Sequence, residues 1–281
     1  MKFHEFGDKE NPHIMLIHGG GNSWWNYLRQ AKVLSKEYHV ILPTLDGHGE
    51  EYNTEYVSTT DSAQKLISYI NRNCNGQLFL LCGVSLGGQI VIEMLSLKAD
   101  ICQKAIIDGS ICYPQPKLEK FCIATVKLFG GLMFSRFSCK CQMVLLRLSP
   151  NMRFPKEIEN YYIHDMPLLK RNTLYTMYRT YMAEYQLKKD ISKTKAQIMY
   201  CYGSKEMKCV KESAQLFKKL VPSCQIYEAK GYNHGYLAIY LPDEWLKVVV
   251  PFLNSPLAFP LVACFLHHTY RFCVYMQFQY L

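Results

Sequence analysis

A serine in a glycine-framed turn is the residue of this sequence with the clearest capacity for chemistry. Ser85 lies in Gly83-Val84-Ser85-Leu86-Gly87, after an apolar run at 78–82 and before a segment with the pattern of a helix. This setting fits a nucleophile elbow, which holds a serine hydroxyl at a sharp corner. The glycines are needed because the chain passes too close to itself there for side chains. The helix N-terminus beside Ser85 favours developing negative charge, so we predict that Ser85 is a nucleophile.

His234 is the best-placed base for this nucleophile. It lies in the loop Gly231-Tyr232-Asn233-His234-Gly235, which follows the last predicted strand at 224–229. A serine nucleophile needs an imidazole that takes its proton, and a histidine late in the chain fits the order of an elbow-type triad. We therefore predict that His234 is the base.

Two carboxylates could orient this imidazole and stabilise its charged form. Glu206 follows the predicted strand 196–203 and lies between Ser85 and His234 in the chain. Asp108 ends the predicted strand 104–108. The order nucleophile, acid, base favours Glu206 as the acid, and Asp108 is the alternative.

A tetrahedral intermediate also needs hydrogen-bond donors for its oxyanion. We expect one donor to be the N–H of Leu86, which follows the nucleophile. The second is expected from the turn His18-Gly19-Gly20-Gly21, at Gly20 or Gly21. Glycines let a backbone N–H approach a substrate without an intervening side chain.

Apolar strands and amphipathic helices alternate along most of the chain. The predicted strands cover residues 1–8, 13–17, 38–42, 78–82, 104–108, 196–203 and 224–229. The predicted helices cover residues 24–37, 61–73, 86–98, 210–220 and 242–253, with Ser23 as the N-cap of the first. Such alternation predicts an α/β fold with a mostly parallel, doubly wound sheet and helices on both faces. The candidate residues each follow a predicted strand, where functional groups of such sheets gather.

The alternation stops between Tyr113 and Asp190, which we predict to be an inserted helical lid. This segment has 13 Lys and Arg against six Asp and Glu, so it carries +7 of the net charge of +9. These charges could attract an anionic partner, or they could be solvated helix faces. Its 12 Phe and Tyr suit an apolar or aromatic substrate but also fit the packing of the segment itself.

We expect four parts in the chain. Residues 1–112 and 191–254 form the two halves of the core, 113–190 the lid, and 255–281 an atypical apolar C-terminal tail. No apolar run approaches the roughly 20 residues that span a bilayer, although the tail could contact a membrane surface. The N-terminus shows no apolar segment typical of a signal peptide.

The 12 cysteines indicate reduced thiols in a cytoplasmic protein. They form no C-x-x-C pair, and Cys139-Lys140-Cys141 is too tight for a usual zinc site. We therefore expect no metal and no cofactor. The sequence also contains no nucleic-acid-binding motif.

Four motifs together resemble the α/β-hydrolase superfamily. They are His18-Gly19-Gly20-Gly21, Asp46-Gly47-His48-Gly49, Gly83-Val84-Ser85-Leu86-Gly87 and Tyr232-Asn233-His234-Gly235. The resemblance covers about residues 13–253 and implies a Ser85–Glu206–His234 triad beneath a helical cap. A glutamate as the acid departs from the commoner aspartate, and Asp108 occupies the position where some lipases of the superfamily keep their acid.

Three activities are compatible with these residues. The first is a serine hydrolase that cleaves carboxylic esters of small molecules through an acyl-enzyme intermediate. The second is a C–C hydrolase, thioesterase or lyase that uses the same triad. The third is a ligand-binding homologue without catalysis, which an intact triad disfavours.

Overall fold

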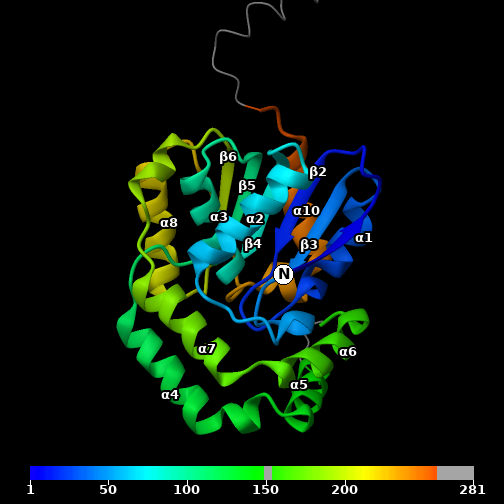
Figure 1. Cartoon of the computed structure of the whole chain (residues 1–281), viewed down its shortest axis with the longest axis vertical. Helices are drawn as coiled ribbons and strands as arrows, with labels where there is room; N and C mark the ends of the chain where they lie inside the picture. The colour runs from blue at the N-terminus through cyan, green and yellow to red at the C-terminus, as the bar shows by residue number, and fades with distance from the viewer. Residues whose placement is uncertain (149–153, 258–281) are drawn as a thin grey trace, which may run out of the picture.

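The computed structural model describes residues 1–148 and 154–257 of the chain (Figure 1). Seven strands form one sheet: β1 (Lys2–Phe6), β2 (His13–Ile17), β3 (His39–Thr44), β4 (Leu78–Val84), β5 (Cys102–Asp108), β6 (Gln197–Gly203) and β7 (Gln225–Ala229). Their order across the sheet is β1-β3-β2-β4-β5-β6-β7. The first strand, β1, pairs antiparallel with β3, and the other neighbours pair in parallel.

The central strands are buried on both faces, as expected for parallel strands covered by helices. Every residue of β3 is buried, as are the last five residues of β4 and of β5. Val84 pairs with Asp108, and Asp108 pairs with Cys201, so β4, β5 and β6 end at the same level of the sheet. This register brings the loops that follow these strands together at one edge.

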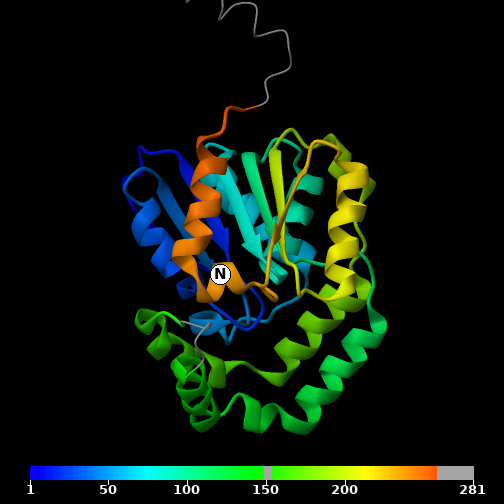
Figure 2. The ribbon, with the colours of Figure 1, turned by 180° about the vertical axis from the view of Figure 1, so that it is seen from behind.

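Helices cover both faces of the sheet (Figure 2). The core helices and short turns are η1 (Trp24–Tyr27), α1 (Leu28–Leu34), η2 (Gly49–Glu51), α2 (Thr59–Asn73), α3 (Leu86–Leu97), η5 (Lys189–Lys193), α8 (Lys208–Leu220), α9 (Tyr236–Tyr240) and α10 (Pro242–Asn254). Apolar residues of α2, α3 and α8 share one core cluster, and those of α1, α9 and α10 share another. The predicted doubly wound α/β fold is confirmed.

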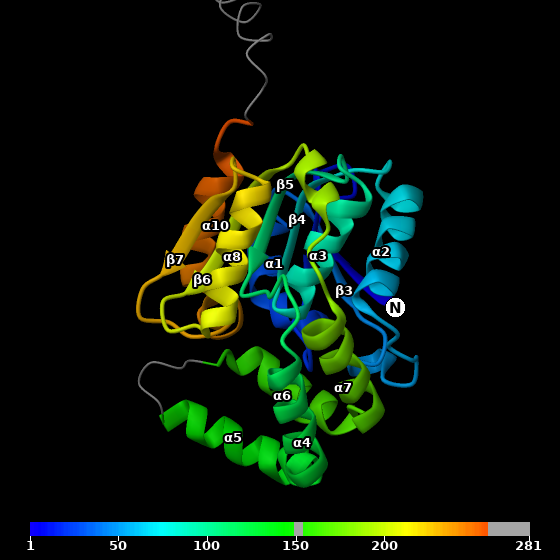
Figure 3. The same ribbon diagram turned by 90° about the vertical axis from the view of Figure 1, so that its left-hand side faces the viewer.

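Every regular element described between residues 113 and 190, outside 149–153, is helical. These elements are α4 (Pro116–Met133), α5 (Arg136–Leu148), α6 (Lys156–Asp165), η3 (Met166–Leu168), α7 (Arg171–Tyr178), the π-helical turn η4 (Arg179–Glu184) and the start of η5. From α4 to η4 they form one group at the edge of the sheet where the parallel strands end (Figure 3). We call this group, residues 116–184, the helical segment.

The helix predicted at 24–37 differs from the structure. It divides into η1 and α1 at Tyr27, whose backbone leaves the helical region at φ −110° and ψ 15°, and it ends at Leu34. The physical reason is that Trp25 and Tyr27 are buried in different apolar clusters, and the Trp25 indole donates a 2.7 Å hydrogen bond to Asp165. Ser23 occupies the N-cap position, but its hydroxyl pairs with Thr44 rather than capping the turn.

The ten cysteines within the described residues are free thiols, and seven of them are buried. No single helix in the described ranges has the length and apolar composition needed to cross a membrane. The consecutive helices Pro116–Met133 and Arg136–Leu146 reach this length and apolar composition only when they are taken together, and they meet at an angle of 91°. Most of the predicted tail, from residue 258 onwards, lies outside the described residues.

Candidate active site

Ser85 lies at the corner between β4 and α3 with a strained backbone. Its φ of +55° and ψ of −114° fall in a region that L-residues seldom adopt. Two hydrogen bonds hold this corner: the Ser85 N–H donates to Asp108 O at 2.7 Å, and the Ser110 hydroxyl donates to Ser85 O at 2.7 Å. The side chain is thereby raised above the carboxyl ends of β4 and β5.

The two framing glycines are sterically required. A Cβ atom at Gly83 would lie 2.3 Å from the backbone of Gly87, and one at Gly87 would lie 2.2 Å from the carbonyl oxygen of Ile17. Backbone atoms cannot retreat from such contacts without moving β2 or α3. The spacing of glycines in the sequence therefore has a direct steric cause.

The structure brings Ser85, His234 and Glu206 into one hydrogen-bonded chain. His234 Nε2 lies 2.9 Å from Ser85 Oγ, and His234 Nδ1 lies 2.8 Å from Glu206 Oε1. Glu206 follows β6 and its side chain is 1% exposed, whereas His234 precedes α9 and is 41% exposed. With Nδ1 donating to the carboxylate, Nε2 is left as the acceptor for the serine hydroxyl.

The charge of Glu206 controls the protonation of this imidazole. Partial burial lowers the pKa of His234, but the hydrogen bond to Glu206 and the negative charges of Glu206 and Asp108 outweigh burial and raise it above its usual value. The protonated imidazole is thus stabilised where it would form.

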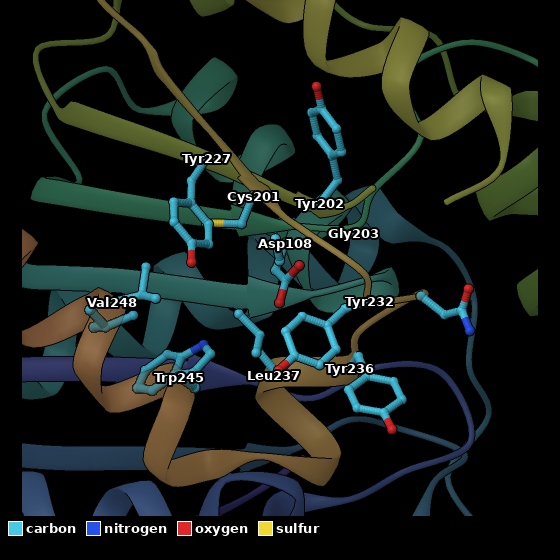
Figure 4. A pocket seen from close by; sticks show the side chains of 13 residues that line it. Asp108, Cys201, Tyr202, Gly203, Tyr227, Tyr232, Tyr236, Leu237, Trp245 and Val248 are labelled. Atoms are coloured by element: carbon cyan, nitrogen blue, oxygen red, sulfur yellow. The ribbon is translucent and has the colours of Figure 1, made fainter. Parts of the chain in front are cut away.

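Asp108, the alternative acid, lies beside this chain but does not take the Nδ1 hydrogen bond. Its carboxyl projects into a small pocket with Cys201, Leu237 and Trp245 (Figure 4). The cavity of about 20 Å³ holds roughly one water molecule and is too small for a substrate. Burial, reinforced by Glu206 and opposed by His234, raises the pKa of Asp108 to about 7.

The predicted oxyanion donors gather beside Ser85. Leu86 opens α3, so its N–H has no partner within the helix. A Cβ at Gly20 would lie 3.9 Å from Leu86 Cβ and 2.6 Å from Met177 Sδ, which places Gly20 between α3 and the helical segment. Gly21, with φ +82°, faces Leu169 and Met166 of the same segment.

A buried histidine holds the glycine turn in place. His18 Nε2 accepts from the Leu45 N–H at 3.0 Å, so Nδ1 carries the proton and donates to Gly19 O at 2.8 Å. Burial, together with the neighbouring His48, lowers the pKa of His18 to about 3, which keeps the ring neutral. This histidine therefore acts on the turn that carries Gly20 and Gly21, and not on the proton of Ser85.

Tyr181 is a residue of the site that sequence reasoning missed. Its side chain is buried, and its hydroxyl lies close to the Ser85 side chain and to the Ile111 N–H. Its backbone carbonyl accepts from Gln89 Nε2 at 2.9 Å, and Gln89 also donates to Ile111 O. Nothing in the local sequence marks Tyr181, because it reaches Ser85 only when the helical segment folds over α3.

Gly109 is a second missed position. A Cβ there would lie 3.2 Å from Glu206 Oε1 and 3.2 Å from the His234 ring, and the backbone has φ +62°. The Gly-Ser pair after β5 was visible in the sequence, but its proximity to the imidazole was not.

No group of three or more His, Cys, Asp and Glu within residues 1–148 and 154–257 has the arrangement of a metal site. The side chains gathered at the sheet edge can instead support nucleophilic attack by an activated serine hydroxyl on an electrophilic carbon.

The fold is shared with several solved hydrolases. An E-2-(acetamidomethylene)succinate hydrolase is 17% identical, with a TM-score of 0.72 over 90% of this chain and 94% of that one. A thermophilic esterase from Thermogutta terrifontis is 17% identical, with a TM-score of 0.70 over 90% and 92%. An enol-lactonase from Burkholderia xenovorans is 16% identical, with a TM-score of 0.69 over 90% and 96%.

Sequence comparison points to the same superfamily. A curated "AB hydrolase superfamily protein" from Gibberella zeae is 28% identical over 102 residues. This match covers 34% of this chain and 34% of that protein. The family model described as "Serine aminopeptidase, S33" matches residues 8–238, which include every residue of the hydrogen-bonded chain. The chain therefore belongs to this S33 family of α/β hydrolases.

Proposed function

We propose that this hydrolase cleaves carboxylic esters through a Ser85–His234–Glu206 triad and an acyl-enzyme intermediate. The observation that carries the proposal is the continuous hydrogen-bonded chain, with 2.9 Å from Ser85 Oγ to His234 Nε2 and 2.8 Å from His234 Nδ1 to Glu206. Nucleophile, base and orienting acid thus lie within hydrogen-bonding reach in the required order.

In this mechanism His234 takes the Ser85 proton as Oγ attacks the ester carbon. The carbonyl oxygen becomes an oxyanion that accepts hydrogen bonds from the N–H groups of Leu86 and of Gly20 or Gly21. His234 then passes the proton to the leaving alcohol, and the acyl group stays on Ser85. Water, deprotonated by the same imidazole, attacks the acyl-enzyme. The acid is released as His234 returns this proton to Ser85 Oγ, while Glu206 keeps its hydrogen bond to Nδ1.

We further propose that the substrate is a small molecule with an apolar acyl group and that the helical segment serves as its lid. Met177, Leu169 and Met166 project from that segment toward Gly20 and Gly21. Thioether and aliphatic side chains favour hydrocarbon over charged groups. Structural neighbours described as an esterase and an enol-lactonase support ester chemistry, and the thiol-rich composition supports a cytoplasmic location.

A panel of p-nitrophenyl esters from acetyl to lauroyl tests this proposal. Ser85→Ala is expected to reduce kcat/KM by roughly 10⁴–10⁶-fold. Ser192→Ala, which removes an exposed hydroxyl bonded to Lys189 O, is the matched control and should retain full activity. Undiminished turnover by Ser85→Ala would eliminate the triad, whereas turnover of thioesters or C–C substrates alone would replace the ester assignment.

A further inference from the structure

The outer helices of the helical segment expose an unusual number of large apolar side chains. Nine of the fourteen exposed large hydrophobic residues in the described ranges lie on α4 and α5, and they are 37–76% exposed. They are Phe121, Leu128, Phe129, Leu132, Met133, Phe137, Val144, Leu145 and Leu148. Exposed apolar surface that is gathered in this way marks an interaction site more often than scattered single residues do.

These residues form a stripe with the same spacing on both helices. Phe121, Leu128 and Leu132 follow one another at intervals of seven and four residues, and so do Phe137, Val144 and Leu148. Such intervals place side chains on one face of a helix. The opposite faces are occupied by buried residues, including Val126 and Gly130 of α4 and Cys139 and Met143 of α5.

Basic side chains run along one side of each stripe. Exposed Lys120, Lys127 and Arg136 each directly precede a residue of the stripe, and Lys140 lies on the same side of α5. From residue 116 to 148 the sequence has six Lys and Arg and a single carboxylate, Glu119. The net charge of the stretch 116–148 is therefore +5, more than half of the +9 of the whole chain.

The two helices form the outermost layer of the molecule on this side. In Figure 3, α4 and α5 lie farthest from the sheet, and α6 and α7 lie between them and the core. Their inner faces pack on α7, η4, α6 and η3. The stripes thus face away from the protein at the end of the molecule that carries Ser85.

We propose that the outer face of α4 and α5 docks on an anionic phospholipid surface. Helices with an apolar stripe flanked by lysine and arginine bind bilayer interfaces, because the stripe enters the acyl boundary and the cations meet the lipid phosphates. A second copy of this chain fits less well, since a two-fold contact would bring the basic residues of two copies together. The proposal does not depend on ester hydrolysis, because it concerns a surface outside the hydrogen-bonded chain of Ser85.

Vesicle flotation of the full chain tests the apolar stripe. Vesicles of phosphatidylcholine are compared with vesicles that also contain phosphatidylglycerol. Leu128→Glu and Phe137→Glu are each expected to weaken partitioning to the anionic vesicles by about 10–100-fold, as expected for losing one buried apolar side chain. Val57→Glu should partition like wild type. It introduces the same charge at an apolar residue that is 50% exposed and lies outside the helical segment.

A second set of variants tests the charge. Lys120→Gln and Lys127→Gln should each weaken binding to the anionic vesicles about fivefold. Lys218→Gln, at an exposed position on α8, should leave it unchanged. Unfolding temperatures verify that each variant is folded.

Three outcomes would overturn the proposal. In the first, wild type does not bind anionic vesicles. In the second, all variants bind as wild type does, which would place attachment elsewhere in the chain, including residues 255–281. In the third, wild type is a dimer that Leu128→Glu dissociates, which would assign the surface to a second copy.

Discussion

The Nδ1 atom of His234 lies 2.8 Å from Oε1 of Glu206, and the two side chains differ sharply in exposure. The carboxylate is 1% exposed and the imidazole 41%. A buried carboxylate is weakly screened, so its charge acts on the imidazole more strongly than a surface ion pair would. The imidazole keeps an open edge toward Ser85, where a substrate would lie.

The raised pKa of His234 predicts the pH dependence of hydrolysis. The base must be neutral, so kcat/KM should fall as the pH drops through a value above the usual 6.5 or so of histidine. Glu206→Gln removes the charge that raises this pKa and should shift the acidic limb to lower pH. It should also reduce kcat by up to about 10⁴-fold, because the imidazolium loses its stabilising partner.

A pH–rate profile of wild type and Glu206→Gln checks this prediction. Asp108→Asn serves as the comparison, since its charge also raises the pKa of His234 but it does not contact Nδ1. It should retain far more activity than Glu206→Gln. If Asp108→Asn were instead the more damaging change, Asp108 would be the acid.

Because Asp108 is buried, we predict that replacing it increases the free energy of unfolding. Its pKa is raised from 3.8 to about 7, so the folded state resists its ionisation, and stability is lost as the pH rises through this interval. Asp108→Asn removes the penalty. The gain in unfolding free energy should be roughly 2 kcal/mol larger at about pH 8 than at about pH 5.

Urea unfolding at the two pH values measures this difference. Asp190→Asn is the control, because a hydrogen bond from Lys193 lowers the pKa of that exposed carboxyl and the change should give no such gain. An equal effect of Asp108→Asn at both pH values would show that Asp108 ionises normally in the folded protein.

We predict that a side chain at Gly109 reduces activity by more than its effect on stability explains. Gly109→Ala would place a methyl group 3.2 Å from both Glu206 and the His234 ring. Displacement of the imidazole should reduce kcat/KM by about 10–100-fold. Gly231→Ala is matched to it, because Gly231 also has positive φ, +86°, but nothing lies within 4 Å of the added atom. Both variants should lose about 1–2 kcal/mol of stability, and only Gly109→Ala should lose activity. Equal activities would contradict the contact.

Tyr181 predicts a further effect on the chemical step. Tyr181→Phe keeps the ring but removes the hydroxyl that lies beside the Ser85 side chain. We expect kcat to fall about tenfold with KM and the unfolding temperature nearly unchanged, as for the loss of one polar neighbour of the nucleophile. Tyr178→Phe, one turn earlier in the same segment, is the control. A parallel loss in both variants would indicate a packing effect.

The sequence predicted most of the sheet because buried parallel strands are apolar runs with clear ends. All seven strands were found, with boundaries shifted by a few residues. The elbow was recognisable because close backbone contacts leave no room for a side chain at its two framing glycines. Glu206 and His234 were found through their places after β6 and β7. The structure places His234 within hydrogen-bonding distance of Ser85, and Glu206 within hydrogen-bonding distance of His234.

The remaining features depend on contacts between distant parts of the chain. Tyr181 lies beside Ser85 although the two residues are 96 positions apart in the sequence, and no local sequence pattern indicates this proximity. The break at Tyr27 arises from packing of Trp25 against the helical segment. The basic residues of 113–190 looked scattered in the sequence, and their alignment with an apolar stripe became visible only once the faces of α4 and α5 were known.

The most direct test of an activated Ser85 is the intact mass of the protein after reaction with a fluorophosphonate. We predict a single adduct on wild type, retained in Ser192→Ala, strongly slowed in Glu206→Gln and absent in Ser85→Ala. Folded wild type that gains no adduct, or Ser85→Ala that still gains one, would contradict the activation of Ser85.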